Sequence, residues 1–192
     1  MIISPFLKDL SFLPDPKMIL IGGTSGSGKS TFLNEYLSSY RVLDVDLIHY
    51  ELHQTHDRSQ NLSYSIQELS KRVQDQIQDR KSFIYPGTHT RLGTVLNRLI
   101  EAKQKNFSTA FIFLEVSPKI AYLRNQKRVQ SGGHGETILF QKIETKYKYG
   151  KKVYKFFETG KIQSEDQKQD LEKRNLDPIA AQMLVDFLHL TK

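Results

Sequence analysis

The sequence feature that most constrains the fold is a glycine-rich stretch, GGTSGSGKST, at residues 22–31. A short apolar run at residues 18–21 precedes it, and a helix-compatible segment follows it at residues 31–37. Gly23, four further residues and then Gly28-Lys29-Ser30 match the phosphate-binding loop pattern. The order of strand, glycine loop and helix predicts that the chain binds a nucleoside triphosphate. The alternative is a glycine turn that only joins a strand to a helix.

The residue types in this loop predict how the nucleotide is held. Glycines let backbone N–H groups turn toward phosphate oxygens, where a Cβ would obstruct them. The N-terminus of the following helix adds partial positive charge. We expect the Lys29 amine to reach the β- and γ-phosphates of ATP and the Ser30 hydroxyl to bind Mg²⁺. The predicted ATP-binding residues are Gly23, Thr24, Ser25, Gly26, Ser27, Gly28, Lys29, Ser30 and Thr31, with Ser30 as the metal ligand.

Length and composition favour one α/β domain that contains a parallel sheet of the P-loop NTPase type, flanked by helices. The chain has 192 residues, of which we expect 1–16 to form an N-terminal arm. Cysteine is absent, which excludes disulfides and thiolate metal sites. The net charge of +7 suits polyanionic ligands such as nucleotides, phosphorylated substrates and nucleic acid. We find neither a signal-peptide pattern nor an apolar run of about 20 residues, so we expect a cytoplasmic protein without membrane contact.

Two acids lie at the end of the second predicted strand, which we place at residues 41–46. Ligands of open parallel sheets lie beyond the carboxyl ends of the strands, so we expect Asp46 beside the phosphate loop. Asp44 would lie one pleat deeper on the same side of the strand. A carboxylate there would take a proton from a substrate hydroxyl or hold the water shell of Mg²⁺. The alternative is an aspartate that caps a helix.

The middle of the chain predicts further alternation of strands and helices. The polar stretch at residues 47–62 is interpreted as a loop over the substrate pocket, and a metal site at His53 and His56 is disfavoured. Periodicity predicts helices at 63–81 and 91–105, and strands at 82–85 and 109–116. The second of these strands is nearly all apolar, as expected for a buried central strand. Thr88 lies in the loop after the first of them.

The segment at about 117–157 predicts a helical lid. Ser117-Pro118 begins a helix that carries Arg124 and Arg128 on one face. A glycine-containing segment at 131–135 then leads into a second helix at about 136–157. Arginines on a mobile element can neutralise charge on a transferring phosphoryl group. The alternative is that both arginines are ordinary surface charges. Residues 161–163 are a weak candidate for a fifth strand, and a C-terminal helix is expected from residue 177.

With these motifs, the chain resembles the zeta-toxin-like kinases over about residues 17–157. The more specific part of the likeness is RNQKRVQSGGH at residues 124–134, followed by Tyr147. The family has a P-loop α/β fold, and its characterised members phosphorylate a hydroxyl of UDP-N-acetylglucosamine. The resemblance implies that Asp46 activates the acceptor hydroxyl and that Arg124 and Arg128 act from the lid. The remaining candidates for substrate contacts are Asp44, Thr88 and His134.

Two positions depart from this family pattern. Pro86 stands where members tend to have a glutamate before the Gly/Thr turn. Thr145-Lys146-Tyr147 stands where Arg-Arg-Tyr is usual, and a lysine keeps the charge without the bidentate fork. The identity of the acceptor therefore stays open.

The sequence favours a Mg²⁺- and ATP-dependent kinase that phosphorylates a small-molecule hydroxyl, with a nucleotide sugar as one candidate. The nearest alternative is a kinase that acts on the 5′-hydroxyl of a nucleic acid, whose affinity would fall with salt. A third reading is a non-catalytic ATP-binding or ATPase module, for which Glu115 is the closest match to a Walker B acid. An antitoxin-like protein partner also stays open.

Overall fold

The computed structural model describes residues 13–54, 61–131, 137–178 and 181. Four strands and seven helices follow one another along these residues. They are β1 Lys17–Gly22, α1 Lys29–Tyr36, β2 Arg41–Val42, α2 Val45–His53, α3 Leu62–Gln78, β3 Phe83–Gly87, α4 Leu92–Gln104, β4 Ser108–Phe113, α5 Pro118–Gln130, α6 Phe140–Thr159 and α7 Glu165–Glu172.

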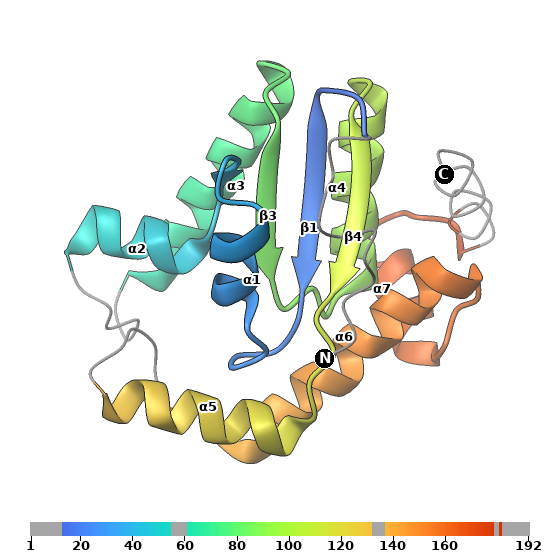
Figure 1. The fold of residues 1–192 in the computed structure, drawn as a ribbon. Coiled ribbons are helices and arrows are strands. Elements are labelled where there is room, and N and C mark those ends of the chain that lie inside the picture. The colour runs from blue at the N-terminus through green and yellow to red at the C-terminus, as the bar shows by residue number, and fades with distance from the viewer. Residues whose placement is uncertain (1–12, 55–60, 132–136, 179–180, 182–192) are drawn as a thin grey trace.

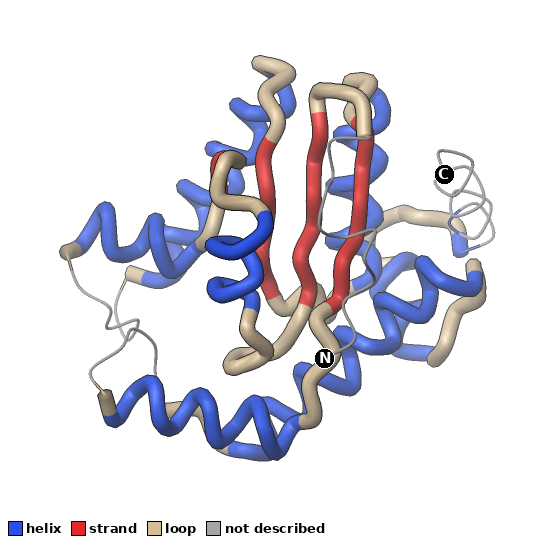
Figure 2. Tube along the Cα trace, in the orientation of Figure 1, coloured by secondary structure: helices blue, strands red, loops and turns tan. Residues whose placement is uncertain are grey.

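The four strands form one parallel sheet in the order β2-β3-β1-β4. In the centre, Ile19 of β1 pairs with Ile84 of β3 on one side and with Ala110 of β4 on the other. The strand arrows in Figure 1 point the same way, so all carboxyl ends lie at one edge of the sheet. Figure 2 shows that the loops after β1, β3 and β4 gather at this edge. The predicted α/β fold with a P-loop-type parallel sheet is confirmed.

Helices cover both faces of the sheet, because alternate residues of the buried strands point to opposite sides. On one face, Ile19 and Ile21 of β1 pack against Phe32 and Leu33 of α1. On the other face, a larger core joins β1 and β3 to α3, α4, α6 and α7. Both α5 and α6 lie beyond the carboxyl edge, where they pass below the sheet in Figure 1. The glycine loop therefore lies between the sheet and these two helices.

The second predicted strand is shorter than expected. It ends at Val42, and the polar stretch interpreted as a loop begins instead with helix α2. The reason is local: Asp44 is the N-cap of α2, and its carboxylate accepts a hydrogen bond from the backbone N–H of Asp46 at 2.7 Å. Asp44 and Asp46 therefore stand at the start of a helix, and the prediction that both alternate along one strand is wrong.

The imidazoles of α2 have a packing role. The ring of His53 lies 4.8 Å from that of His49, and His49 Nδ1 is 2.8 Å from Ser65 Oγ of α3. His56 lies outside the described residues.

Two other strand predictions need correction. The third strand runs two residues further than predicted, so that Pro86 and Gly87 pair with Ile21 and Gly22. β2 pairs only with Phe83 and Ile84, and the later part of β3 therefore tolerates a proline.

The strand β4, expected in the centre, is an edge strand of the described sheet. Its apolar sequence is explained by packing on both faces, since Phe111 lies against the core that includes α4 and α6, and Ile112 belongs to the core that includes α1.

The predicted arm, lid and C-terminal helix are only partly described. The helix predicted from Ser117-Pro118 is present as α5, with Ser117 Oγ accepting from the N–H of Ile120 at 3.4 Å. Most of residues 1–16, His134 and most of the helix expected after 177 lie outside the described residues. Residues 161–163 do not form a strand. The division of the chain into one domain with an arm and a lid stays a prediction. Within the described parts of the chain, no helix combines the length and apolar character needed to cross a membrane.

Candidate nucleotide-binding site

The loop between β1 and α1 has the backbone shape that its glycines predict. Gly23, Gly26 and Gly28 have φ values of +152°, +80° and +93°, which side chains rarely allow. A Cβ on Gly26 would lie 2.0 Å from the carbonyl oxygen of Ala121, and a Cβ on Gly23 would lie 2.5 Å from Ser27 Oγ. The loop is thus closed on itself and packed against α5, in a form that only glycine fits.

The N-terminus of α1 is open to an anion. Its N-cap is Gly28, so no side chain caps the first N–H groups, and the first turn carries no acid. Ser30 and Thr31 are exposed at this turn. The uncapped N–H groups and the partial positive charge of the helix end are the two features that phosphate groups use. This end of the loop therefore fits a nucleotide phosphate.

The Lys29 side chain folds back over the loop. Its Nζ donates hydrogen bonds to the carbonyl oxygens of Gly23 at 2.7 Å and Thr24 at 3.0 Å. Burial lowers the pKa of Lys29 to about 8, and Asp44 and Asp46 partly oppose this shift. The positive charges of Arg128 and Lys146 lower the pKa of Lys29 further. Two backbone carbonyls therefore hold the amine, and charges from the start of α2, from α5 and from α6 act on it.

The two acids at the start of α2 face this amine. Burial raises the pKa of the Asp44 carboxyl, and the neighbouring charge of Asp46 raises it further, while hydrogen bonds from the backbone and the charge of Lys29 oppose the shift. Both aspartates are half-buried. Asp44 is already engaged as the helix cap, so Asp46 is the better placed of the two to act on a ligand.

Helix α5 docks onto the glycine loop through its polar side. The buried Asn125 donates from Nδ2 to Ser25 Oγ at 3.1 Å, and Arg128 donates from Nη2 to the same oxygen at 3.3 Å. Within the part of the chain that the structure describes, the buried Nε of Arg128 has no hydrogen-bond partner. The nearest atom to an imagined Cβ on Gly28 is Nη1 of Arg124, at 3.9 Å. Both arginines of the predicted lid thus lie at the loop, and Arg128 keeps an unused donor.

Helix α6 also contacts the glycine loop and places a positive charge that acts on Lys29. Thr24 Oγ1 donates to the carbonyl oxygen of Ile143 at 3.4 Å, and the charge of Lys146 acts on Lys29. The carbonyl oxygen of Thr88 lies 3.2 Å from an imagined Cβ on Gly150. Lys146 occupies one of the two positions where the resembling family has arginine. Its position here retains a positive charge at the loop.

His89 is a residue of this region that sequence reasoning did not select. Its Nε2 donates to the carbonyl oxygen of Tyr85 at 3.0 Å, and its ring packs edge-on against Tyr85 and Phe111. Burial lowers the pKa of His89 to about 4; its bond to the Tyr85 carbonyl opposes the shift, and the charge of Lys29 adds to it. Because a carbonyl only accepts, Nε2 carries the proton and Nδ1 is an acceptor. No sequence pattern around His89 indicates a functional residue, and only its contacts in the structure bring it to notice.

Glu115, the nearest match to a Walker B acid, is engaged elsewhere. Its carboxylate forms an ion pair with Lys151 and accepts a hydrogen bond from the hydroxyl of Tyr147. These contacts lower its pKa. Among the described residues, no group of three or more histidines and acids is arranged to hold a metal ion. Mg²⁺ in nucleotide sites takes only one or two protein ligands in addition to phosphate and water, so a site of this kind does not require such a group.

Comparisons with known proteins agree with this fold. A family model described as an AAA domain (AAA_33) matches residues 18–147. A solved structure of the Pnkp1/Rnl/Hen1 RNA repair complex is similar with a TM-score of 0.60 and 17% identity, over 73% of this chain and 46% of that chain. A second solved structure, from the PezAT chromosomal toxin–antitoxin system of Streptococcus pneumoniae, has a TM-score of 0.57 and 20% identity. The similarity covers 75% of this chain and 64% of that chain. The chain thus spans less than half the length of the first of these structures. No curated protein matches the sequence.

A parallel sheet with a glycine loop, a lysine and two helices over its carboxyl edge defines an α/β protein with a P-loop-type parallel sheet. The chain belongs to the AAA domain family AAA_33, whose model covers more than half of its length.

Proposed function

We propose that this protein is an ATP- and Mg²⁺-dependent kinase that transfers the γ-phosphoryl group to a hydroxyl of a small molecule. A nucleotide sugar is the first candidate acceptor, because the sequence resembles the zeta-toxin-like kinases. One arrangement carries the proposal: Arg128 of α5 reaches Ser25 of the glycine loop, and the charges of Asp44, Asp46 and Lys146 act with it on the Lys29 amine. Phosphoryl transfer needs this combination of positive charge and a carboxylate beside a phosphate loop.

The nucleotide would be held by the glycine loop. Its phosphates fit the uncapped N-terminus of α1, and the Lys29 amine would exchange its two carbonyl acceptors for phosphate oxygens. The Ser30 hydroxyl would hold the metal ion. Mg²⁺, when bound, neutralises charge on the β- and γ-phosphate oxygens. The unused Nε donor of Arg128 would then meet the transferring group.

The chemical step requires one base. The acceptor oxygen forms a bond to the γ-phosphorus while the bond between that phosphorus and the bridging oxygen to the β-phosphate breaks, leaving ADP. The proton of the acceptor hydroxyl passes to the Asp46 carboxylate. Asp44 holds the first turn of α2 in place through its cap, and so positions Asp46. Arg124, Arg128 and Lys146 would neutralise the charge that spreads over the transferring oxygens.

A second acceptor class, the 5′-hydroxyl of a nucleic acid, is supported by Lys146 of α6, whose charge acts on Lys29 of the glycine loop. A non-catalytic ATP-binding module is less favoured, because Glu115 is paired with Lys151 on α6.

Transfer of labelled γ-phosphate from MgATP tests the proposal. The acceptors are nucleotide sugars, nucleosides and 5′-hydroxyl oligonucleotides, with wild type and Lys29→Ala in parallel. We expect label on a small-molecule acceptor that is lost in Lys29→Ala. Label on oligonucleotides alone would move the activity to the second class. Tight ATP binding with no labelled acceptor would overturn the kinase proposal in favour of a binding module.

The pKa of Lys29 predicts how nucleotide affinity depends on pH. A bound phosphate favours the charged amine, whose pKa in the free protein is about 8. Affinity for MgATP should therefore be about twofold lower at pH 8 than at pH 7, and then fall by up to about tenfold per pH unit as the amine loses its proton. Calorimetric titrations from pH 7 to 9.5 measure this. Lys29→Ala should bind more weakly and show no such fall, and an equal fall in both proteins would contradict the assignment to Lys29.

A further inference from the structure

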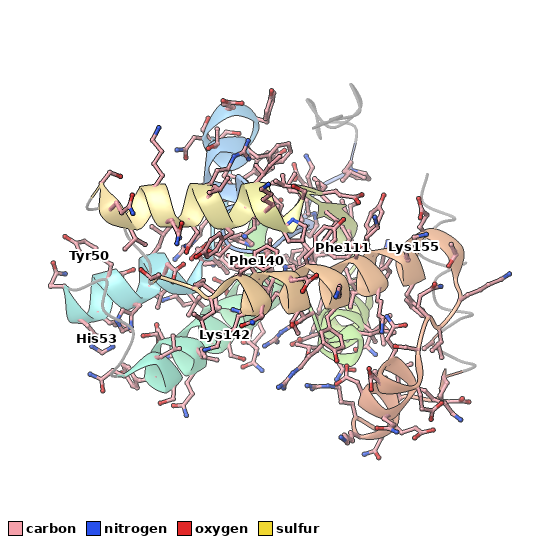
Figure 3. The ribbon with its side chains drawn as sticks, turned by 90° about the horizontal axis from the view of Figure 1, so that it is seen from below. Tyr50, His53, Phe111, Phe140, Lys142 and Lys155 are labelled. Atoms are coloured by element: carbon pink, nitrogen blue, oxygen red, sulfur yellow. The ribbon has the colours of Figure 1, made fainter. Side chains whose placement is uncertain are left out.

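A shallow groove of about 510 Å³ lies on α6, away from the glycine loop. It is lined by four lysines and two tyrosines, with one threonine and one glutamine completing it. None of the described residues that line it is acidic or aliphatic. Figure 3 shows the molecule from below, with α6 running across the face from Phe140 past Lys142 to Lys155. The groove therefore opens on an outer face and not into the core.

The lysines of the groove carry charge that is only partly compensated. Lys148 pairs with Glu144 at 3.3 Å, and Lys151 pairs with Glu115. Lys152 and Lys155 form no ion pair with any residue in the described ranges. The groove thus presents a surplus of positive charge to solvent, on a helix with six lysines and two glutamates.

The tyrosines alternate with these cations. Lys152 Nζ lies 5.5 Å from the ring centroid of Tyr149, and Lys151 Nζ lies 5.7 Å from that of Tyr147. Tyr149 is 39% exposed. The lining residues of α6 extend from Thr145 to Lys155, a length of about 15 Å along a helix axis. Ring faces that alternate with ammonium groups over this length suit bases that stack and phosphates that pair.

We propose that this α6 groove binds a single-stranded nucleic acid. A single phosphate would not use charges spread over several turns of helix. An acidic protein would seek a pocket for an anchoring side chain, and this groove offers only lysine stems and tyrosine rings, without an aliphatic residue. Single strands offer both regularly spaced phosphates and exposed base faces. The proposal goes beyond the kinase function and does not require the bound strand to be the acceptor.

A second hollow shares Tyr149 with the groove. Tyr149 also lines a neighbouring hollow of about 570 Å³, to which Arg91, Lys173 and Arg174 contribute. Asp166 and Asp170 line the same hollow, so its charge is mixed. Asp170 is engaged by the backbone N–H of Gly93 at 2.7 Å. Tyr149 therefore marks the point at which the purely basic surface ends.

Fluorescence anisotropy with a labelled oligouridine of about 12 nucleotides, added to the full chain without ATP, tests this proposal. If four lysines contact phosphates, log K should fall against log salt with a slope of about −3. The double variant Lys152→Gln, Lys155→Gln should bind at least about tenfold more weakly, with a slope about half as steep. The matched control Lys71→Gln, Lys105→Gln removes two exposed lysines elsewhere and should bind within about twofold of wild type.

Three further variants separate stacking and catalysis from charge. Tyr149→Ala should weaken binding about tenfold, whereas Tyr149→Phe, which keeps the ring, should not. Lys29→Ala should bind the oligonucleotide normally, so that loss of kinase activity and loss of groove binding are distinguishable. Equal losses in the groove and control double variants would overturn the proposal. The proposal would also be overturned if a polyglutamate peptide, or vesicles that contain phosphatidylserine, bound more tightly than the oligouridine.

Discussion

Replacing Arg128 with alanine should lower kcat for phosphoryl transfer by about 10³-fold or more, the range in which arginines act on transferring phosphoryl groups. The reason is geometric. Arg128 reaches Ser25 of the glycine loop from α5, and its buried Nε has no hydrogen-bond partner among the described residues. Its charge also acts on Lys29. An arginine in this position obtains an acceptor for its remaining N–H donor only when negative charge develops on the phosphoryl group during transfer.

Three controls separate this role from a structural one. Lys127→Ala removes an exposed charge one position earlier on α5 and should leave kcat within about twofold. Arg128→Lys should restore only a small part of the rate, because an ammonium lacks the planar fork. The affinity for MgATP and the melting temperature of Arg128→Ala should stay close to those of wild type. A loss confined to KM, with kcat unchanged, would show that Arg128 only binds the nucleotide.

Replacing Asp46 with asparagine should lower kcat by about 10²- to 10⁴-fold, the contribution of a positioned general base. The substitution keeps the size of the side chain and removes the carboxylate that would take the acceptor proton. Steady-state rates at saturating ATP and acceptor measure the effect. Nucleotide affinity should change much less, because Lys29 and the glycine loop remain.

Asp44→Asn is the matched comparison for this variant. Asparagine also caps helices well, so α2 should keep its first turn and the rate should fall far less than in Asp46→Asn. If Asp44→Asn were the more damaging change, Asp44 would be the base and Asp46 the supporting residue. Asp44→Ala should instead lower stability by about 1 kcal/mol through loss of the cap.

The glycine loop is a part of the structure that the local sequence pattern predicts well. Its spacing alone predicted a strand before it and a helix after it, and both are present. The φ values of Gly26 and Gly28 explain why, since only glycine adopts them freely. Ser117-Pro118 likewise predicted the start of α5 from residue preference alone. These features depend on contacts within a few residues, which a sequence records directly.

The acids after β2 show where local pattern fails. The sequence VLDVD fits a strand by alternation, yet Asp44 bonds to its own backbone and begins a helix. The β-propensity of this stretch competes there with the tendency of Asp44 to cap a helix. The outcome depends on how many residues of β2 pair with β3. The apolar run of β4 was equally ambiguous. Burial by helices on both faces produces the same pattern in an edge strand as in a central one.

The sequence by itself determined the phosphate loop, the order of most strands and helices, and the acids and arginines worth testing. Only the tertiary structure decided that β4 lies at the edge, that Asn125 and Arg128 meet at Ser25, and that the half-buried ring of His89 packs against Tyr85 and Phe111. The physical reason is the range of the interactions involved. Turn geometry and caps are settled by neighbours along the chain, whereas sheet order and buried polar contacts join residues about a hundred positions apart, as Ser25 and Asn125 are.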